Sequence, residues 1–355
     1  MVGEKTKKQT AREITEKYEI KKYYTFLDDK NQIICKLCPN NCVIAENKSG
    51  LCCTRINSEG KFYSVVYGRP CSLHIDPIEK KPLYQYYPGE GILSLGTFGC
   101  NLFCKGCQNF DITRADAISS VKHLKYYTPE EIVDTAIEND IKLIAYTYNE
   151  PTIFFEYMID IAKLAKKKGI KNVIVSNGYI NPEPLKELCK YIDAANIDIK
   201  GITPEFYREY SKANIKPVLE TIKTLHKNKV WLELTNLIIP GLNDDPKDIK
   251  KLCEWIKKNV GENVPLHFSR FYPHHQASKI IPTSTSTLDY AKQIAEEYGI
   301  KYIYIGNVGL LDNTYCSKCK SLLISRSYTD VDMRDLHGPN KNKCSCGAIL
   351  PGMFK

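Results

Sequence analysis

The amino-acid sequence predicts an α/β fold: a closed or partial barrel of parallel strands, with a cysteine-rich extension on each side. Short apolar runs rich in β-branched residues recur through the middle of the chain, as expected of strands buried on both faces. Amphipathic stretches separate these runs, and repeated β-then-α units imply parallel strands with right-handed crossovers. The cysteines predict the extensions, because all fifteen except Cys189 and Cys253 fall into three groups.

Strands and helices alternate along the predicted barrel. The apolar runs lie at residues 92–99, 142–147, 172–176, 196–199, 231–239, 265–271 and 302–306. Thr128-Pro129-Glu130-Glu131 has the pattern of a capping box with proline at the first helical position. Residues 152–168 keep an apolar stripe and end at Gly169, a favourable C-terminal cap. In barrels of this kind the chemistry lies on loops at the C-terminal ends of the strands.

We expect three parts: an N-terminal cysteine-rich extension over 1–90, a core barrel over 91–306, and a zinc-ribbon-like segment over 307–355. The first ~20 residues are polar, are expected to form a loosely attached helix, and lack the apolar region of a signal peptide. No stretch approaches the ~18 consecutive apolar residues of a membrane-spanning helix. The sequence therefore predicts a cytoplasmic protein without membrane association.

The cysteines indicate metal binding, because the cytosol keeps thiols reduced and disulfides are rare there. Cys189 and Cys253 stand apart on apolar helix faces and are expected to be inert core residues. The formal net charge of +9 does not include the negative charge of metal-bound thiolates. If three thiolates hold an iron–sulfur cluster and two sets of four hold Zn²⁺, the total falls to about +4, because ligating thiols are deprotonated. Nucleic-acid binding is therefore not the expected role.

A cysteine loop follows the first predicted barrel strand, with Cys100, Cys104 and Cys107 in the spacing C-x3-C-x2-C. Such a loop can wrap a cubane cluster, yet it supplies only three thiolates, whereas electron-transfer clusters and structural zinc sites ordinarily use four. Three ligands leave one iron open to a chelating substrate. The alternative is a zinc or ferredoxin-like site whose fourth ligand comes from elsewhere.

This loop resembles that of the radical S-adenosylmethionine (SAM) superfamily, whose members share the spacing on a (β/α)6 partial TIM-like barrel. The resemblance implies that Cys100, Cys104 and Cys107 bind a [4Fe-4S] cluster and that SAM chelates the open iron. Reductive cleavage of SAM then yields a 5′-deoxyadenosyl radical that abstracts a hydrogen atom from the substrate. The cofactors supply this chemistry, so no catalytic residue beyond the cluster is expected. Gly106 departs from the family, which commonly has an aromatic residue before the last cysteine.

Later strand ends match the same superfamily in order. By resemblance, the side chains that hold SAM are Asn149, Glu150, Ser176, Asn177, Asp198 and Lys200. His267 is a weaker candidate, included because it could face the site from the strand 265–271. Alternation places Asp198 and Lys200 on one face of their strand, and buried Asp and Lys are rare unless paired or liganded. The alternatives are a proline turn with a solvated Glu150, an Asn-Gly turn after Ser176, a structural Asp198–Lys200 ion pair and a core histidine at 267.

The flanking segments extend the resemblance from about Cys35 to the C-terminus. The run 76–109, with YNEPTIFFEY, SNGY, IDIKG and NTYC, resembles the radical SAM member of the AmmeMemoRadiSam system, a group related to pyruvate formate-lyase activating enzyme. Upstream, a four-cysteine metal site is expected, with zinc preferred over a second iron–sulfur cluster; its ligands are Cys35, Cys38, Cys42 and Cys52. Cys53, Cys71 and His74 are spare ligand candidates.

The C-terminal segment is expected to carry a zinc site of four cysteines, Cys316, Cys319, Cys344 and Cys346. About 40 residues rarely bury a core of their own, so a metal is expected to stabilise them. The C-x-C spacing of the second pair departs from the usual C-x2-C. Either the site is distorted, or only some of these cysteines bind metal.

The leading hypothesis is an oxygen-sensitive radical SAM oxidoreductase that resembles an activating enzyme and abstracts hydrogen from a protein. A ferredoxin or flavodoxin is the expected electron donor. One alternative is a radical SAM enzyme that acts on a small metabolite. Another is an iron–sulfur electron-transfer protein without SAM chemistry, which the polar strand ends argue against. A zinc-ribbon nucleic-acid module is a further alternative, with only mild support from the stretch CSKCKSLLISRSY.

Overall fold

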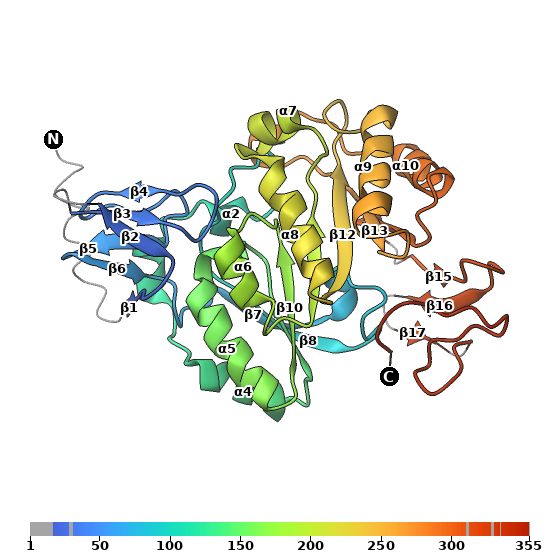
Figure 1. Ribbon diagram of the computed structural model, residues 1–355, viewed down its shortest axis with the longest axis horizontal. Helices are drawn as coiled ribbons and strands as arrows, with labels where there is room; N and C mark the ends of the chain where they lie inside the picture. The colour runs from blue at the N-terminus through green and yellow to red at the C-terminus, as the bar shows by residue number, and fades with distance from the viewer. Residues whose placement is uncertain (1–16, 28–30, 310–311, 328–329, 334, 355) are drawn as a thin grey trace. The chain divides into compact units, whose positions relative to one another are not determined.

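The computed structural model describes residues 17–27, 31–309, 312–327, 330–333 and 335–354 (Figure 1). The chain forms two compact units. Unit 1 comprises Met1–Ile75, Leu93–Phe103 and Cys107–Asp193, and unit 2 comprises Asp76–Ile92, Cys104–Gly106 and Ala194–Lys355. The helix expected over the first ~20 residues falls mostly outside the described residues. The domain boundaries expected after residues 90 and 306 stay predictions.

Unit 1 contains most of β8 (Gly91–Gly96), whose first two residues belong to unit 2, and all of the parallel strands β9 (Leu143–Tyr146) and β10 (Lys171–Ser176). Leu93 pairs with Ile144, and Asn172 pairs with the same residue from the other side. All four residues of β9 are buried, as a continuous apolar run predicts. The helices of this unit include α4 (Pro129–Glu138), α5 (Phe155–Lys167) and α6 (Pro182–Leu188).

Two helix starts in unit 1 can be compared with the sequence prediction: one forms as predicted, and the other begins as a different type of helix. The capping box at the start of α4 is formed, since the Thr128 hydroxyl accepts from the Glu131 amide and the Glu131 carboxylate accepts from the Thr128 amide. The helix expected over 152–168 begins instead as a 3-10 turn, Pro151–Phe154, before α5 starts. The side chain of Glu150 caps this turn, which fixes the segment that follows β9.

Unit 1 also contains two small antiparallel sheets in the region of the N-terminal cysteines. One has the strand order β1-β6-β5 and the other β2-β3-β4. The strands are β1 (Tyr18–Glu19), β2 (Tyr24–Leu27), β3 (Gln32–Cys35), β4 (Val43–Ile44), β5 (Arg55–Ser58) and β6 (Lys61–Ser64). The metal-ligand candidates therefore lie on strand ends and tight connections.

Unit 2 contains the later parallel strands, which pair in chain order: β11 (Ala194–Asp198), β12 (Trp231–Ile238), β13 (Leu266–Arg270) and β14 (Ile303–Gly306). The helices that connect them include α8 (Ile215–Lys227), α9 (Pro246–Asn259) and α10 (Thr285–Glu297). Figure 1 shows this alternation of strand and helix. Parallel pairing of consecutive β–α units is the arrangement that the apolar runs predict.

The C-terminal segment of unit 2 adds short strands, β15 (Thr314–Tyr315), β16 (Leu322–Arg326) and β17 (Val331–Asp332). Its apolar side chains share a core with Tyr302 and Tyr304 on and next to β14 and with Tyr84. The Arg326 guanidinium, which is 0% exposed, donates to the Tyr84 carbonyl oxygen. Among the described residues, no helix has the length and apolar character needed to cross a membrane.

Candidate active site

The cysteine loop leaves β8 through a tightly packed turn in unit 1. The side chain of Asn149 holds this turn, donating to the Gly99 carbonyl at 2.9 Å and accepting from the Thr97 amide at 3.2 Å. A Cβ on Gly96 would lie 2.5 Å from the Thr147 carbonyl oxygen, so only glycine permits this approach. The predicted SAM ligand Asn149 therefore has a positioning role at the start of the loop.

The sulfur atoms of the loop each have a polar neighbour. Within unit 1, Cys100 Sγ accepts from the Leu102 amide at 3.4 Å, and Cys107 Sγ lies 3.3 Å from the Thr113 hydroxyl. Within unit 2, Cys104 Sγ lies 3.5 Å from the Ser211 hydroxyl. Hydrogen bonds of this kind stabilise thiolates and tune the clusters that they hold.

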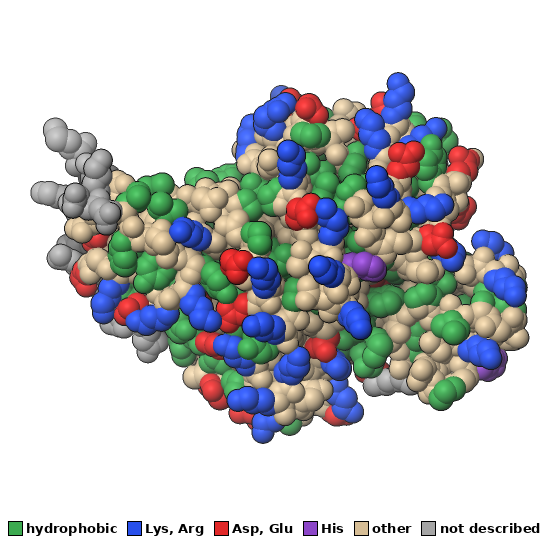
Figure 2. Space-filling view, viewed as in Figure 1, with side chains coloured by type: hydrophobic (Ala, Val, Ile, Leu, Met, Phe, Trp, Pro, Cys, Tyr) green, Lys and Arg blue, Asp and Glu red, His purple; other side chains and the backbone are tan. Residues whose placement is uncertain are grey.

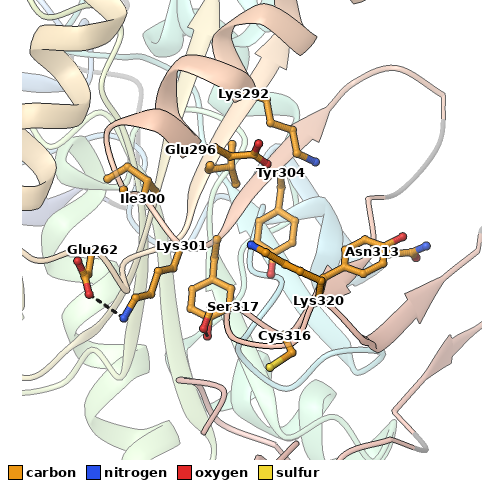
Figure 3. Close-up of a pocket in the computed structure, with 14 residues that line it drawn as sticks. Glu262, Lys292, Glu296, Ile300, Lys301, Tyr304, Asn313, Cys316, Ser317 and Lys320 are labelled. Atoms are coloured by element: carbon orange, nitrogen blue, oxygen red, sulfur yellow. Dashed lines mark hydrogen bonds and ion pairs between the residues drawn. The ribbon is translucent and has the colours of Figure 1, made fainter. Parts of the chain in front are cut away.

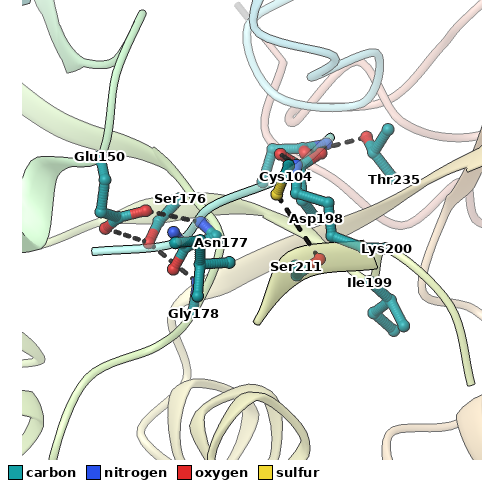
Figure 4. A network of polar contacts seen from close by, with 12 residues as sticks. Cys104, Glu150, Ser176, Asn177, Gly178, Asp198, Ile199, Lys200, Ser211 and Thr235 are labelled. Carbon is teal, nitrogen blue, oxygen red and sulfur yellow. Dashed lines mark hydrogen bonds and ion pairs between the residues drawn. The ribbon is translucent and has the colours of Figure 1, made fainter. Parts of the chain in front are cut away.

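A second network joins the loops after β9 and β10 (Figure 4). The buried carboxylate of Glu150 accepts from the Ser176 hydroxyl at 2.8 Å and from the Asn177 amide at 2.8 Å. It also accepts from the amide and hydroxyl of Thr152. Burial raises the pKa of Glu150, although these hydrogen bonds oppose the shift. The structure thus brings together three residues predicted to hold SAM.

The amide of Asn177 connects this network to the cysteine loop. Its Nδ2 lies 2.9 Å from Asn101 Oδ1, to which it donates, and 3.8 Å from Cys100 Sγ. Its Oδ1 accepts from the Tyr179 amide. Asn101 in turn donates to the Tyr179 carbonyl at 2.7 Å. In unit 1 the first cysteine of the loop, Cys100, is therefore contacted by the segment that follows β10.

Asp198 and Lys200 form an ion pair in unit 2, with Nζ 2.7 Å from Oδ2 (Figure 4). Strand β11 ends at Asp198, so Lys200 lies two residues beyond it, and the contact brings together the two side chains that the sequence predicts to point the same way. Burial disfavours the Lys200 ammonium, but Asp198 and Cys104 outweigh it, so the pKa of Lys200 lies above its ordinary value. Both side chains keep some exposure, 32% for Asp198 and 21% for Lys200, which leaves them accessible to a charged ligand.

Gly106, the departure from the family pattern, is enclosed by aromatic side chains of unit 2. A Cβ at this position would lie 2.4 Å from the Tyr210 hydroxyl oxygen and 2.9 Å from the Phe271 ring. The Gly106 amide donates to that hydroxyl at 3.1 Å. Tyr210 and Phe271 thus occupy the space beside the loop that a side chain at position 106 would need.

His267 lies in the interior of unit 2, with an exposed fraction of 3%. Its Nε2 is 2.7 Å from Glu233 Oε2, and its ring packs edge-on against Tyr84. Glu233 also accepts from the backbone amides of Tyr84 and Gln85. A role of His267 toward SAM stays a prediction, and its contacts are those of a hydrogen-bonded core histidine.

Several residues that contact the cysteine loop were not singled out from the sequence. In unit 2, Tyr207–Ser211 forms a turn of π-helix that supplies the Ser211 hydroxyl and the Tyr210 ring. Turns of π-helix occur often at functional sites. The letters YREYS carry no motif, because these contacts depend on tertiary placement. Thr113 lies six residues after Cys107. This short separation was the one feature of the sequence that could have indicated their contact.

The four C-terminal cysteines come together in unit 2. The Sγ atoms of Cys316, Cys319, Cys344 and Cys346 all lie within 4.8 Å of one another. Cys316–Cys346 and Cys319–Cys344 are each separated by 3.6 Å. A tetrahedral Zn²⁺ with Zn–S bonds of ~2.3 Å holds its sulfur ligands about 3.8 Å apart. All four thiols therefore belong to one group, including both thiols of the C-x-C pair.

Unit 2 also contains a pocket of about 600 Å³ beside this segment (Figure 3). Three lysines line it, Lys292, Lys301 and Lys320, and two of them are paired: Lys292 with Asp312 at 3.0 Å and Lys301 with Glu262 at 2.6 Å. Its lining includes Cys316 but none of the residues predicted to hold SAM or the cluster. On the face seen in Figure 2, Lys and Arg are interspersed with Asp and Glu and form no continuous basic patch.

Comparison with known proteins identifies the superfamily. The sequence model described as the radical SAM superfamily matches residues 95–256. The chain is 44% identical to the uncharacterized protein MJ0808 of Methanocaldococcus jannaschii, over 92% of this chain and 96% of that protein. It is 27% identical to the pyruvate formate-lyase-activating enzyme of Clostridium pasteurianum, over 50% of this chain and 77% of that enzyme.

A further relative is the 4-hydroxyphenylacetate decarboxylase activating enzyme of Clostridium scatologenes. The chain is 28% identical to it over 44% of its own length, and the match spans about half of that enzyme, 53%. These matches confirm the predicted partial α/β barrel. The chain belongs to the radical SAM superfamily and is homologous to the activating enzymes of pyruvate formate-lyase and other glycyl-radical enzymes.

Proposed function

We propose that this chain is a SAM-cleaving enzyme that abstracts a hydrogen atom from a protein substrate. The observation that carries the proposal is the set of polar contacts around the cysteine loop, from Asn177 to Cys100 and from Ser211 to Cys104. The loop offers three thiolates with hydrogen-bonding neighbours, which fits a [4Fe-4S] cluster with one open iron. Bound there, the cluster would supply one electron that splits SAM into methionine and a 5′-deoxyadenosyl radical, which takes a hydrogen atom from the substrate.

The protein side chains would bind and orient SAM. The carboxylate of Asp198 can accept from the methionyl ammonium, and the ammonium of Lys200 can donate to the methionyl carboxylate, because both remain partly exposed. Glu150 has both oxygens engaged by the loops after β9 and β10. Its contribution is to fix Ser176 and Asn177, whose polar groups border the cysteine loop. An electron carrier without SAM chemistry would not need these polar side chains at the strand ends.

A protein substrate is supported by the relatives that are named as activating enzymes of pyruvate formate-lyase and of 4-hydroxyphenylacetate decarboxylase. Each of those names describes an enzyme that acts on another enzyme. The stretch 92–306 offers no long insertion to serve as a dedicated lid. We further assign the chain to the radical SAM component of the AmmeMemoRadiSam system, on the run 76–109. A ferredoxin or flavodoxin would deliver the electron.

A zinc site in the C-terminal segment is part of the same proposal. The four thiols already lie at separations close to those of tetrahedral Zn²⁺ coordination. Cys316 and Cys344 are buried, and they belong to the core that the segment shares with Tyr302 and Tyr304. The metal would stabilise a segment whose strands are only two to five residues long.

The substrate class is tested by isotope transfer. Cells grown in deuterated medium are lysed anaerobically, and the extract is separated by size into protein and small-molecule fractions. Reduced enzyme and SAM are added to each fraction, and 5′-deoxyadenosine is analysed by mass spectrometry. Deuterium incorporation is expected with the protein fraction. Incorporation with the small-molecule fraction alone would reject a protein substrate while keeping the radical chemistry.

A further inference from the structure

The N-terminal cysteines line one small cavity in unit 1. Four thiols contribute to its wall, together with Arg55 and Asn101: Cys35, Cys38, Cys42 and Cys52. Cys35 ends strand β3 and is 6% exposed, and Cys52 is 8% exposed. Backbone hydrogen bonds hold the ligand loop closed, from the Cys35 amide to the Cys42 carbonyl and from the Asn41 amide to the Cys38 carbonyl. The cavity is therefore a formed feature of the fold.

The thiols of this cavity receive hydrogen bonds as metal-bound sulfurs do. The Leu51 amide donates to Cys42 Sγ at 3.5 Å, and the Thr54 hydroxyl donates to Cys52 Sγ at 3.2 Å. Such donors are typical neighbours of a ligating thiolate, because they stabilise its negative charge. Cys53, which is exposed, does not line the cavity. The structure thus separates the two adjacent cysteines into one that faces the cavity and one that does not.

A buried cation with one unused hydrogen-bond donor lies on the cavity wall. The Arg55 side chain is 2% exposed, and its terminal nitrogens pair with Glu156 at 2.6 and 3.0 Å. Its Nε has no hydrogen-bond partner in the part of the chain that the structure describes. Four thiolates around a dication or a dicationic cluster core carry a net charge of about −2. Such a centre would complement the guanidinium.

The spacing of the thiols distinguishes a cluster from a single metal ion. Among the described residues, the group of thiols that all lie within 4.8 Å of one another is the C-terminal one, and it includes none of the four N-terminal cysteines. Zn²⁺ draws its sulfur ligands to about 3.8 Å from one another. An iron–sulfur cluster holds them farther apart, because several irons and sulfides lie between the cysteines. A cavity walled by four thiols that do not form such a close group fits the cluster.

We propose that Cys35, Cys38, Cys42 and Cys52 hold a second iron–sulfur cluster, in place of the zinc that the sequence favoured. This centre borders the loop of the first. Asn40, between two of its ligands, donates through Nδ2 to the Asn101 carbonyl at 2.8 Å. A Cβ on Gly99 would lie 2.4 Å from the Cys52 carbonyl oxygen. The ligand loop of the second cluster therefore positions the residues on both sides of Cys100.

Metal analysis of the full chain tests the proposal without relying on SAM cleavage. Protein is reconstituted anaerobically with iron and sulfide, and iron and zinc are counted per chain. We expect that Cys35→Ser/Cys38→Ser lowers the iron content by about four, the content of one cubane. Zinc content should stay unchanged. Cys53→Ser is the matched control and should keep all the iron.

The complementary variant separates this site from the first cluster. In a Cys104→Ala/Cys107→Ala protein, about four irons should remain, with the absorption and Mössbauer signature of a cluster. Complete loss of iron in that variant would overturn the proposal. So would X-ray absorption of the wild type that shows two zinc–sulfur sites per chain, a measurement that needs no variant to fold. Loss of the second cluster alone would leave the first assignment standing.

Discussion

The Lys200 ammonium lies 2.7 Å from the Asp198 carboxylate, two residues earlier in the same chain segment. The Lys200 backbone amide also donates to the Tyr207 hydroxyl at 3.1 Å. The ion pair is thus held from the strand side and from the π-helical turn. Partial exposure distinguishes it from a fully buried structural pair, because a charged ligand can reach both side chains.

Changing either member of this pair should weaken SAM binding and spare the cluster. Loss of a hydrogen bond to a charged group costs about 1.5–3 kcal/mol, so Asp198→Asn or Lys200→Met should raise the Kd for SAM about tenfold or more. Equilibrium binding by the reconstituted protein and its iron content are the two measurements. Lys186→Met removes an exposed pair with Glu183 and should change neither. If iron and fold are lost together in the Asp198 and Lys200 variants, the pair is structural.

The first cluster should require the cysteines of its own loop as ligands. Cys104→Ala/Cys107→Ala should remove about four irons and abolish the change in the electron paramagnetic resonance spectrum that SAM induces, because the open iron disappears. Cys189→Ala serves as the control, since this thiol lies on α6's C-terminal cap, away from the loop in sequence. An unaltered SAM-dependent spectrum in the double variant would refute the ligand assignment.

Gly106 should tolerate no side chain. In Gly106→Ala, the new Cβ would meet the Tyr210 hydroxyl and the Phe271 ring. Overpacking of this kind typically destabilises a protein by about 1–3 kcal/mol. Here it would displace the loop between Cys104 and Cys107. We expect slower SAM cleavage and an oxygen-labile cluster. Gly169→Ala is a control for glycine replacement, because nothing lies within 4 Å of its added Cβ, and its cost comes only from a φ of +76°. Comparable SAM cleavage in both variants would contradict the packing argument.

The C-terminal thiols should account for one zinc. Cys316→Ala/Cys319→Ala should lower the zinc content by one and make residues beyond ~310 sensitive to protease. A structural zinc contributes ~10–16 kcal/mol of apparent binding free energy in small peptides, more than such short strands replace by packing. Inductively coupled plasma mass spectrometry and limited proteolysis measure the two effects. An intact segment with unchanged zinc would mean that its shared core with Tyr302 suffices.

The sequence predicted the strands of the barrel because they are continuous apolar runs, and each run recurs in the structure within a few residues. It also predicted that the side chains of Asp198 and Lys200 point the same way, and they form an ion pair although β11 ends at Asp198. It could not predict that Ser211 approaches Cys104, because that contact depends on a π-helical turn 107 residues later in the chain. Nor could it show which cysteine of the Cys52–Cys53 pair faces the cavity, since adjacent thiols are equivalent in a spacing pattern.

The contact of residues 85–87 with Met353 constrains the order in which the newly made chain can fold. Within unit 2, the Tyr87 amide donates to the Met353 carbonyl, and the Met353 amide donates to the Gln85 carbonyl. During synthesis, residues 85–87 therefore lack a partner that is made 266 residues after Tyr87. Contacts of such long range form slowly and late. Any iron–sulfur assembly factor that loads the chain before Met353 emerges would meet a unit 2 whose folding is incomplete.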